Sequence, residues 1–490
     1  MPLIVVVIMP NTESTKRLLR YALAGLGALL VGWWLFADTV RHHWPGLADA
    51  GPAIIRFAHF GNYRDYETWG RIIAAFEQRY FGSRVRQEYI VGWQGAYETK
   101  IRQQMLAGTL PQVVLMQLGP FVQMAGEPGD NGGFADLTEL VDGPSLGLDR
   151  SSLAATGVQV FTRNGRILGL PVSGGNLLIY CNPDCFARAA EHRQKEIPFP
   201  DDDWTIEQFR ELAGELTCDF DGDGRIDQFG FWQPRWIYYL PFLWSFGARV
   251  LDDSGRQWLL QGPQAEEALA FYRGLQLGDH SDGTSSPAKG GPVSPRPDQV
   301  AQMFQDVGFL TGKTAMCVNG PWFQPFLADT RLADRYRVAH IPIGPAGRVT
   351  RITWDGVCMA DGLPLDQRMA AWKFIRFVCS QQAQKILAAS GRALPALASA
   401  ASSSAADGGG CGGKFVEALA YSRTQPITPF FRQLDHAINR HLARLLRGSK
   451  AISPGQCLSD LAADRDIVRH FDNIKGEHRE HREHREQDSP

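Results

Sequence analysis

The hydrophobic positions in the first part of the chain alternate between the spacing of strands and the spacing of helices. Residues 54–59, 85–91 and 112–116 form short apolar runs that predict strands. Residues 65–80 and 96–107 carry apolar side chains at the three- and four-residue spacing of amphipathic helices. This β-α-β-α-β order predicts an α/β domain with a largely parallel sheet.

A second α/β pattern begins near Gly169. Strand-like runs lie at residues 177–180 and 337–343, and helical patterns lie at 206–216 and 264–277. The chain has 490 residues, and single hydrophobic cores stop growing at roughly 250–300 residues. Pattern and length together predict more than one compact α/β unit.

Three segments lack a pattern that could pack into a core. Residues 278–297 are rich in Gly, Ser and Pro, and residues 399–413 are a low-complexity run of Ser, Ala and Gly, so both predict flexible loops. Residues 477–486 repeat Glu-His-Arg three times. Their histidines suggest weak metal binding as an alternative, but the composition favours a disordered, charged tail at 473–490.

The amino-terminal region predicts export. Lys16, Arg17 and Arg20 precede residues 21–37, which carry no charge and would span about 25 Å as a helix. A basic flank places the amino-terminal side in the cytoplasm and the rest of the chain on the other side of the membrane. Residues 1–50 are therefore predicted to be a cleaved signal peptide or a retained signal anchor, and the body is predicted to be periplasmic or otherwise extracytoplasmic.

Charge and composition exclude several classes of function. The 50 Lys and Arg are balanced by 52 Asp and Glu, whereas nucleic-acid binders carry a basic excess. The eight cysteines form no CxxC pair and show no metal-type spacing, so zinc is not expected and their disulfide pairing stays open. The unusual feature is the content of 13 tryptophans.

Several motifs occur in an order that resembles one protein family. Residues 165–186 contain Gly-Leu-Pro followed by Tyr-Cys-Asn-Pro-Asp-Cys-Phe, residues 312–322 read Gly-Lys-Thr-Ala-Met-Cys-Val-Asn-Gly-Pro-Trp, and residues 370–395 read as helices ending in Leu-Pro. With their flanking segments they span residues 53–472. This order resembles the family 1 extracellular solute-binding proteins of ABC importers, the group that includes maltose-type sugar-binding proteins.

The resemblance implies a periplasmic-binding-protein-like fold of two α/β lobes with a hinge. Lobe one would take residues 53–170 and 353–398, and lobe two would take residues 176–345 and 414–472. The resemblance also implies a monomer that binds a small molecule, uses no nucleic acid, and delivers its ligand to ABC permease subunits in the membrane. The ligand would bridge the lobes and shift an open–closed equilibrium.

Tryptophans and polar side chains predict a carbohydrate ligand. A sugar presents apolar faces that aromatic rings cover and hydroxyl groups that polar side chains pair. Trp322 matches the family position whose tryptophan stacks on the ligand, with a core position as the alternative. Trp354 and Asp355 would add a second aromatic plate and a charged acceptor, and Trp232 and Trp236 would line lobe two.

Three further polar residues follow predicted strands. They are expected near the ligand because open α/β sheets bind ligands beyond the carboxyl ends of their strands. Asn62 has an ordinary turn residue as its alternative, since Gly-Asn is common turn chemistry. The three residues are Asn62, Gln117 and Asn176.

An acidic segment at residues 219–227 resembles the first nine positions of an EF-hand calcium loop. Gly230 occupies the twelfth position, where a bidentate carboxylate would be expected. The segment predicts either a structural calcium ion or an acidic turn whose carboxylates bond nearby backbone N–H groups. No other cofactor is expected. The candidate ligands are Asp219, Asp221, Asp223 and Asp227.

The leading hypothesis is a binding protein and not an enzyme. The sequence contains no G-x-S-x-G elbow, no H-E-x-x-H and no P-loop. Two alternatives remain open at this point. One is an exported glycan-acting enzyme, which would use similar aromatic residues with paired carboxylates, and the other is a ligand-sensing ectodomain with the same fold.

Overall fold

The computed structural model describes residues 53–91, 95–125, 133–144, 147–232, 235–278, 290–296, 305–401, 411–447 and 451–472. The predicted export segment at 1–50, most of the predicted loops at 278–297 and 399–413, and the predicted tail at 473–490 lie outside these residues. Within the second loop, the prediction is wrong at residues 411–413, which begin the helix α17 (Cys411–Glu417). Within the described residues, no helix combines the length and the apolar character that crossing a membrane requires. The chain divides into a small unit of residues 1–54 with 81–84 and a large unit of residues 55–80 with 85–490.

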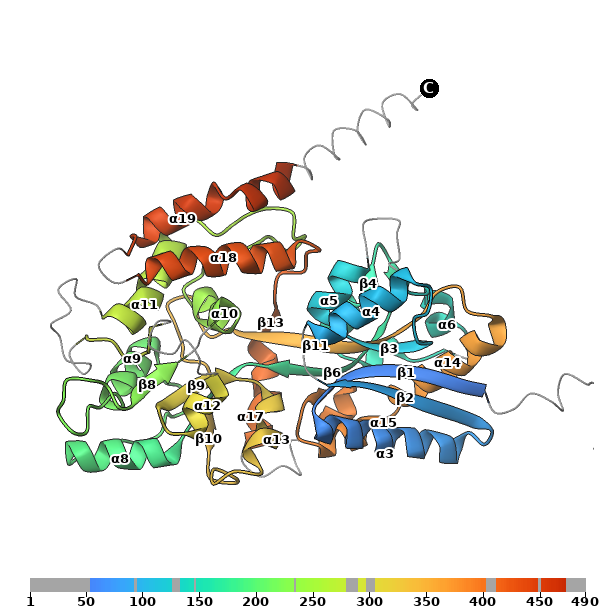
Figure 1. The fold of residues 1–490 in the computed structure, drawn as a ribbon, viewed down its shortest axis with the longest axis horizontal. Helices are drawn as coiled ribbons and strands as arrows, with labels where there is room; N and C mark the ends of the chain where they lie inside the picture. Colours follow the sequence, from blue (N-terminus) through green and yellow to red (C-terminus); the bar gives the residue numbers. More distant parts are fainter. Residues whose placement is uncertain are drawn as a thin grey trace, which may run out of the picture. The chain divides into compact units, whose positions relative to one another are not determined.

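The first sheet has seven strands in the order β12-β6-β11-β3-β1-β2, with β13 pairing to β11 off this path (Figure 1). β1 and β3 run parallel, but β11 runs antiparallel to both β3 and β6. The expected largely parallel arrangement is therefore wrong: the sheet is mixed, because the chain enters it again through β11 after building the second sheet. The strands are β1 (Ala53–Gly61), β2 (Ser83–Val91), β3 (Val113–Gln117), β6 (Leu170–Asn176), β11 (Thr350–Met359), β12 (Leu394–Pro395) and β13 (Ser422–Thr424).

Helices and a small hairpin complete the first lobe. The hairpin pairs β4 (Thr162–Arg163) with β5 (Arg166–Ile167). One hydrophobic core joins Phe57 of β1 to Phe76 and Phe374, and the ring of Phe374 meets both others edge-on. The helices are α3 (Tyr63–Arg79), α4 (Ala96–Leu106), α5 (Leu118–Met124), α6 (Thr138–Asp142), η1 (Arg150–Ser152), α7 (Ala155–Val160), α14 (Leu365–Val378) and α15 (Gln381–Ala389).

The second sheet has four strands in the order β10-β7-β9-β8. β8 and β9 are parallel, whereas β7 is antiparallel to both β9 and β10. The predicted strand at 337–343 is shorter in the structure, because Ile343 leaves the sheet to form an isolated bridge with Thr205. The strands are β7 (Leu178–Cys181), β8 (Phe229–Trp232), β9 (Thr314–Asn319) and β10 (Arg337–Ala339).

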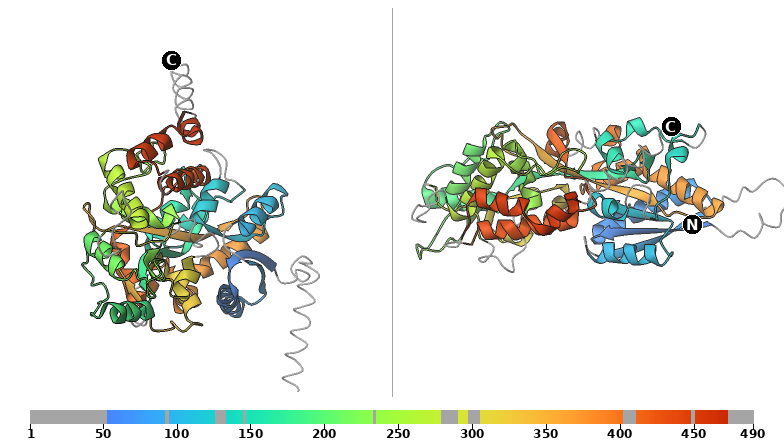
Figure 2. Two further views of the ribbon diagram at one scale, coloured as in Figure 1. Left: turned by 60° about the vertical axis from the view of Figure 1, so that its left-hand side comes forward. Right: turned by 90° about the horizontal axis from the view of Figure 1, so that it is seen from above.

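The helices of the second lobe pack in two clusters. The larger one includes α18 and α19, which lie side by side in Figures 1 and 2, and the smaller one packs α12, η3, α13, α17 and η4 against β7. Seven cysteines with described side chains are buried and free of disulfides. The helices are α8 (Pro183–Arg193), α9 (Ile206–Glu215), α10 (Trp236–Ser245), α11 (Pro263–Leu277), α12 (Gln305–Leu310), η3 (Pro321–Phe323), α13 (Gln324–Leu327), α17 (Cys411–Glu417), η4 (Ala418–Tyr421), α18 (Phe431–Leu445) and α19 (Pro454–Ala462).

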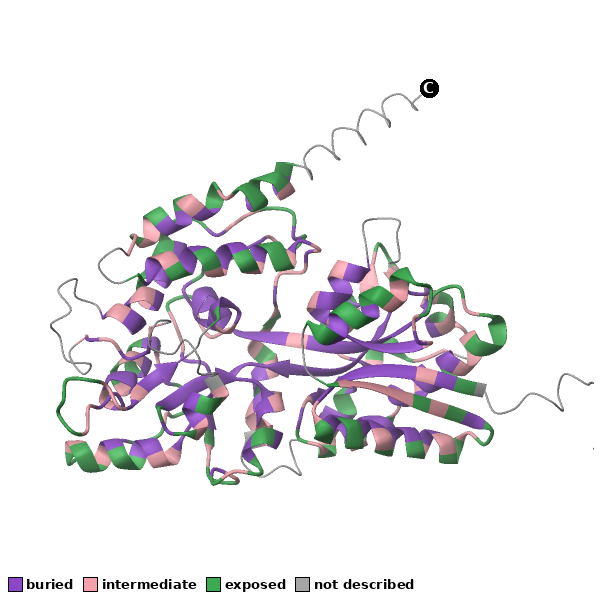
Figure 3. Ribbon diagram, viewed as in Figure 1, coloured by how far each residue is buried: buried purple, intermediate pink, exposed green. Residues whose placement is uncertain are grey.

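The chain passes between the two lobes several times. β6 leads directly into β7, β11 returns the chain beside β6, and β13 pairs with the start of β11. Both β6 and β11 are buried along nearly their whole length (Figure 3). The crossings are tied together by hydrogen bonds: Thr350 Oγ1 donates to the carbonyl of Leu177 at 2.5 Å, and Asn176 Nδ2 donates to the carbonyl of Phe415 at 2.9 Å.

Candidate functional site

A pocket of about 350 Å³ is lined by residues of both lobes. The first lobe contributes the carboxyl end of β3, the start of α5, and parts of β6 and β11. The second lobe contributes the amino-terminal ends of α10 and α18, together with η3, α12 and α13. The lining includes Glu98, Gln117, Gln123, Gly174, Gly175, Arg235, Tyr238, Asp306, Trp322, Phe326, Arg351, Thr353, Asp355, Arg392, Gln425, Phe431, Arg432 and Asp435.

Strand β11 contributes side chains to the pocket from only one of its two faces. Arg351, Thr353 and Asp355 line the pocket, whereas Ile352 and Trp354 belong to the core of the first lobe. This division follows from the period of a β-strand, in which successive side chains point to opposite faces. The alternation ends at Asp355, where the pairing with β6 shifts register.

Trp322 is held against the pocket wall by two glycines. A Cβ atom on Gly175 would lie 2.7 Å from Cζ3 of the indole, and one on Gly320 would lie 2.4 Å from Cη2. Side chains there would displace the ring, so both glycines are required for its position. Trp322 is half-buried and also lines the pocket. The indole therefore presents an aromatic surface to any occupant.

Asp355 is a buried acid with an unfilled acceptor. Its residue is 8 % exposed, and its Oδ1 atom has no hydrogen-bond partner among the described residues. Burial raises the pKa of Asp355 to about 6, although the positive charge of Arg392 opposes the rise. Arg392 Nη1 lies 3.8 Å from Asp355 Oδ2, and its Nε forms a close ion pair with Asp65. Asp355 is thus positioned to accept a hydrogen bond from a ligand hydroxyl.

Two further pairs of opposite charges lie in the pocket lining. Arg432 Nη2 lies 2.6 Å from Glu98 Oε2, joining α18 to α4. Arg235 Nη2 lies 3.5 Å from Asp435 Oδ2. These pairs offset most of the formal charge in the lining.

Asp306 is held by a neutral donor. Its Oδ1 accepts a 2.9 Å hydrogen bond from Asn319 Nδ2. Burial raises the pKa of Asp306, and the Asn319 bond opposes that rise.

The structure places three of the sequence-predicted site residues in the pocket lining and the others elsewhere. Gln117, Trp322 and Asp355 line the pocket. Trp354 is 1 % exposed inside the core of the first lobe, so it lies where no ligand can stack. Trp232 and Trp236 are also buried, at 3 % and 2 % exposure. Trp236 Nε1 donates to Asp435 Oδ1 at 2.6 Å and so positions a lining residue without lining the pocket itself.

The two remaining predicted residues, Asn62 and Asn176, do not line the pocket. Asn62 is the N-cap of α3: its Oδ1 accepts from the N–H of Asp65 at 3.2 Å, and Asp65 Oδ2 accepts from the N–H of Asn62 at 2.7 Å. This capping box stabilises the start of the helix. Asn176 is fully buried at the crossing, where its Nδ2 also donates to Ser422 Oγ at 3.2 Å.

Sequence reasoning missed the arginines of the pocket, above all Arg351 and Arg235. The polar–apolar alternation of Arg-Ile-Thr-Trp-Asp at residues 351–355 is a signal that points to Arg351. No comparable signal existed for Arg235, because α10 and α18 reach the pocket only through tertiary packing.

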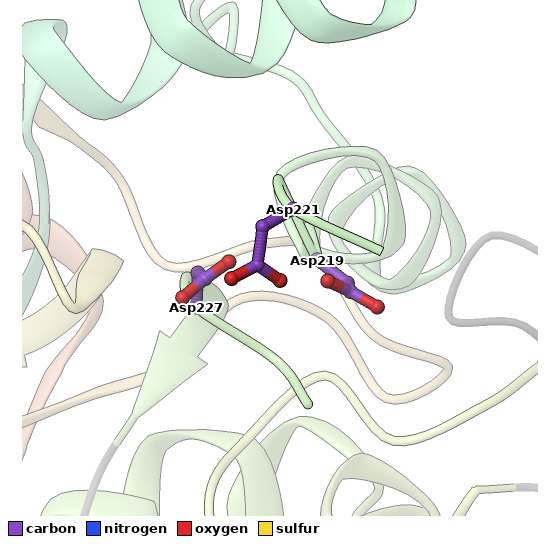
Figure 4. A group of neighbouring side chains, drawn as sticks. All are labelled: Asp219, Asp221 and Asp227. Carbon is purple, nitrogen blue, oxygen red and sulfur yellow. The ribbon is translucent and has the colours of Figure 1, made fainter. Parts of the chain in front are cut away.

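The acidic segment forms a tight turn separate from the pocket. Asp219, Asp221 and Asp227 each offer a carboxylate oxygen within 4.8 Å of one another (Figure 4), and Asp223 is not part of this group. Asp219 accepts from the N–H of Gly222 and Asp227 accepts from the N–H of Phe220, at 2.8 and 2.9 Å. The oxygen ligands fit a hard cation in type, but only three carboxylates converge.

Comparison with known proteins agrees with this architecture. The chain matches solved structures at under 25% identity but high coverage. An ABC substrate-binding protein from Listeria monocytogenes, solved with cycloalternan, has a TM-score of 0.70 at 20% identity and covers 86% of this chain and 99% of its own. Maltose-bound MalE3 from T. maritima has a TM-score of 0.65 at 19% identity and covers 84% and 98%.

The GacH receptor of Streptomyces glaucescens, solved unliganded and with acarbose, has a TM-score of 0.67 at 20% identity and covers 85% and 98%. These similarities establish a two-lobed substrate-binding protein fold. Among curated sequences, a putative binding protein of Brucella abortus is 26% identical over 221 residues, which is 44% of this chain and 47% of that relative. The match thus spans about half the length of the curated relative.

Residues 71–408 match the family described as bacterial extracellular solute-binding protein. The chain therefore belongs to this family, as the motif order predicted.

Proposed function

We propose that this protein captures a carbohydrate in the pocket between its lobes and delivers it to an ABC importer. The observation that carries the proposal is that a half-buried indole, Trp322, and a buried acceptor, Asp355, line the same pocket. An aromatic face covers the apolar side of a sugar ring, and an unfilled carboxylate oxygen accepts from a hydroxyl group. The relatives solved with cycloalternan, acarbose and maltose support the same ligand class.

Selectivity follows from the cost of leaving buried polar atoms unpaired. A buried group without its partner costs about 1–3 kcal/mol. A ligand with a hydroxyl group opposite Asp355 removes this cost, while an apolar analogue does not. The crossings at β6, β11 and β13 would act as the hinge, and bound ligand would favour the closed arrangement that the permease recognises.

The proposal is tested by thermal unfolding of the full-length protein against a library of mono- and oligosaccharides, with amino acids and polyamines as controls. A ligand at 100 times its Kd stabilises the folded state by about 2.7 kcal/mol. We expect saccharides alone to raise the midpoint, titration calorimetry to give one site, and chromatography to show no product. Stabilisation by the controls alone would contradict carbohydrate capture, and hydrolysis products would indicate an enzyme.

The importer role predicts a second result in cells. Deletion of the gene should abolish uptake of the ligand identified in the screen, and the intact gene should restore it. Unchanged uptake in the deletion strain would show that import of this ligand does not depend on the protein.

We place the body of the protein outside the cytoplasm, as membership of an extracellular family supports. Residues 21–37 would direct export, either as a signal peptide or as an anchor. Cell fractionation followed by amino-terminal sequencing of the mature protein distinguishes the two. A mature chain that begins near residue 50 means cleavage, and an intact membrane-bound chain means anchorage.

A structural calcium ion held by Asp219, Asp221 and Asp227 is a separate proposal; Asp223, the fourth expected ligand, lies outside this group. Calcium would stabilise the turn between α9 and β8. Millimolar calcium should then raise the unfolding midpoint, EGTA should reverse the change, and Asp221→Asn should remove it. An unchanged midpoint means that the carboxylates serve only their hydrogen bonds to backbone N–H groups.

A further inference from the structure

Two charged side chains of the pocket lining, Asp306 and Arg351, form no ion pair among the described residues. Asp306 accepts a hydrogen bond from Asn319. Arg351 is 7 % exposed, and its Nε atom has no hydrogen-bond partner in the described part of the chain. Among the described residues, no hydrogen bond or ion pair reaches its guanidinium group. A buried arginine without a counter-ion is uncommon, because each desolvated ion costs several kcal/mol unless it is paired.

The surroundings of Arg351 increase this cost. Burial lowers the pKa of Arg351 to about 10, and the positive charge of Arg235 acts in the same direction while Tyr238 opposes it. Arg235 already has a partner in Asp435. The guanidinium of Arg351 therefore faces a neighbouring cation and a phenol, with no carboxylate of the described chain bonded to it.

We infer that the ligand is an acidic saccharide, whose carboxylate group pairs with Arg351 beside Tyr238 and Arg235. A guanidinium group binds a carboxylate through two parallel N–H···O bonds, which are stronger than bonds between neutral groups. The bound anion supplies a counter-ion for Arg351, which forms no ion pair with the described residues. This inference rests on the proposed function, because it specifies the chemistry of the same pocket.

A singly charged carboxylate fits the pocket better than a phosphate ester. Asp306 lines the same pocket, and its charge, like that of Arg351, acts on Tyr238. Asp355 lies four residues further along β11, about 13 Å away at 3.3 Å per residue. A phosphate monoester carries a charge of about −1.5 to −2 and would be repelled more strongly by these acids.

Two residues of β11 then contact different parts of the ligand. Asp355 accepts from a hydroxyl group, and Arg351, near the start of the strand, binds the carboxylate. Thr353 lies between them on the same face of the strand.

The experiment uses oligosaccharide pairs that differ only in oxidation at C6, so that each uronate has a neutral counterpart, together with the methyl ester of the uronate and a sugar phosphate. Titration calorimetry on the full-length protein should show the uronate binding about 10- to 100-fold more tightly than its neutral counterpart or its ester. Arg351→Met should abolish this preference, so that the uronate, its neutral counterpart and its ester bind the variant with affinities within about twofold of one another.

A second measurement separates a ligand-binding arginine from a structural one. Arg351→Met keeps much of the side-chain volume and removes an unpaired buried charge, so the ligand-free variant should unfold at a higher temperature than the wild type. Arg423→Met is the matched control, because Arg423 is the β13 neighbour of Arg351, is exposed and does not line the pocket. This control should keep the preference for the uronate.

The outcomes separate the two levels of the proposal. Equal binding of uronate and neutral sugar, or tighter binding of the sugar phosphate, overturns the proposal that the ligand carries a carboxylate and leaves carbohydrate capture intact. A lower unfolding midpoint in Arg351→Met, with the preference retained, makes Arg351 structural. Failure of every saccharide to bind the folded protein overturns carbohydrate capture itself.

Discussion

The two faces of the β6–β11 strand pair carry two tryptophans in opposite roles. On one face, Trp354 lies opposite Gly174, and a Cβ there would come within 2.6 Å of its ring. On the other, Trp322 covers Gly175 with an approach of 2.7 Å. The contacts are alike, but Trp354 is enclosed by the core and Trp322 borders a pocket. A close contact between an aromatic ring and a glycine therefore does not show whether the ring binds a ligand. The rest of the ring's surroundings, core or pocket, decides its role.

The largest expected effect is on the core face. Trp354→Ala should lower the free energy of unfolding by about 3–5 kcal/mol, because it removes a large buried side chain and leaves a cavity. Urea denaturation measures the change. Ligand affinity of the folded fraction should stay within about threefold of the wild type. If Trp354→Ala keeps the stability of the wild type but loses ligand affinity, Trp354 contacts the ligand and is not a core residue.

The next effect comes from Asp355, the pocket-face neighbour of Trp354. Burial raises the pKa of Asp355 from 3.8 to about 6. Between these values the folded state holds a proton that the unfolded chain releases, so stability falls as the pH rises through this window and stays lower above it. Asp355→Asn should remove that decline and stabilise the ligand-free protein at pH 7 by about 2–3 kcal/mol.

The control for this prediction is Asp253→Asn, since the Asp253 side chain is 95% exposed. Denaturation between pH 4 and 7 should give parallel profiles for that control and the wild type, and a flatter profile for Asp355→Asn. A variant less stable than the wild type at pH 7 would show that the pairing with Arg392 outweighs the cost of burying the carboxylate.

The sequence predicted the fold better than the site, and residues 354–355 show why. The motif order and the alternation of strands and helices were enough for two α/β lobes. Trp354 and Asp355 were selected as a pair because they are adjacent, yet adjacent strand residues point to opposite faces. Of these two residues, only Asp355 points to the face of β11 that lines the pocket. Counting back from Asp355 in steps of two residues along the strand leads to Thr353 and Arg351, which the sequence analysis did not select.

The mixed direction of the first sheet and the helix ends of lobe two that reach the pocket could not be predicted from local sequence patterns, because both depend on tertiary packing. The direction of β11 depends on where the chain re-enters the first sheet. Arg235 and Asp435 are 200 residues apart in number and meet because α10 and α18 pack in one core. Contacts of this kind leave no local pattern.

The indole on the pocket face gives the third effect. Trp322→Ala should weaken ligand binding by about 1–3 kcal/mol and change unfolding stability less than Trp354→Ala does, since the ring is only half-buried. Trp322→Phe keeps an aromatic face and should recover part of the affinity. Titration calorimetry that shows equal affinity for both variants and the wild type would remove Trp322 from the site.

The smallest and most discriminating effect compares the two glycines with the same substitution. Gly174→Ala pushes a methyl group into the ring of Trp354, and the surrounding core leaves this ring no room to move. The resulting overpacking should lower the free energy of unfolding by about 1–3 kcal/mol, with little change in ligand affinity. Gly175→Ala pushes the same group into Trp322, which can move into the pocket, so stability should change by less than about 1 kcal/mol. Because the displaced indole occupies ligand space, affinity should fall about 5- to 10-fold. If both variants lose stability equally and bind ligand equally well, the two faces do not differ as the geometry indicates, and Trp322 is as structural as Trp354.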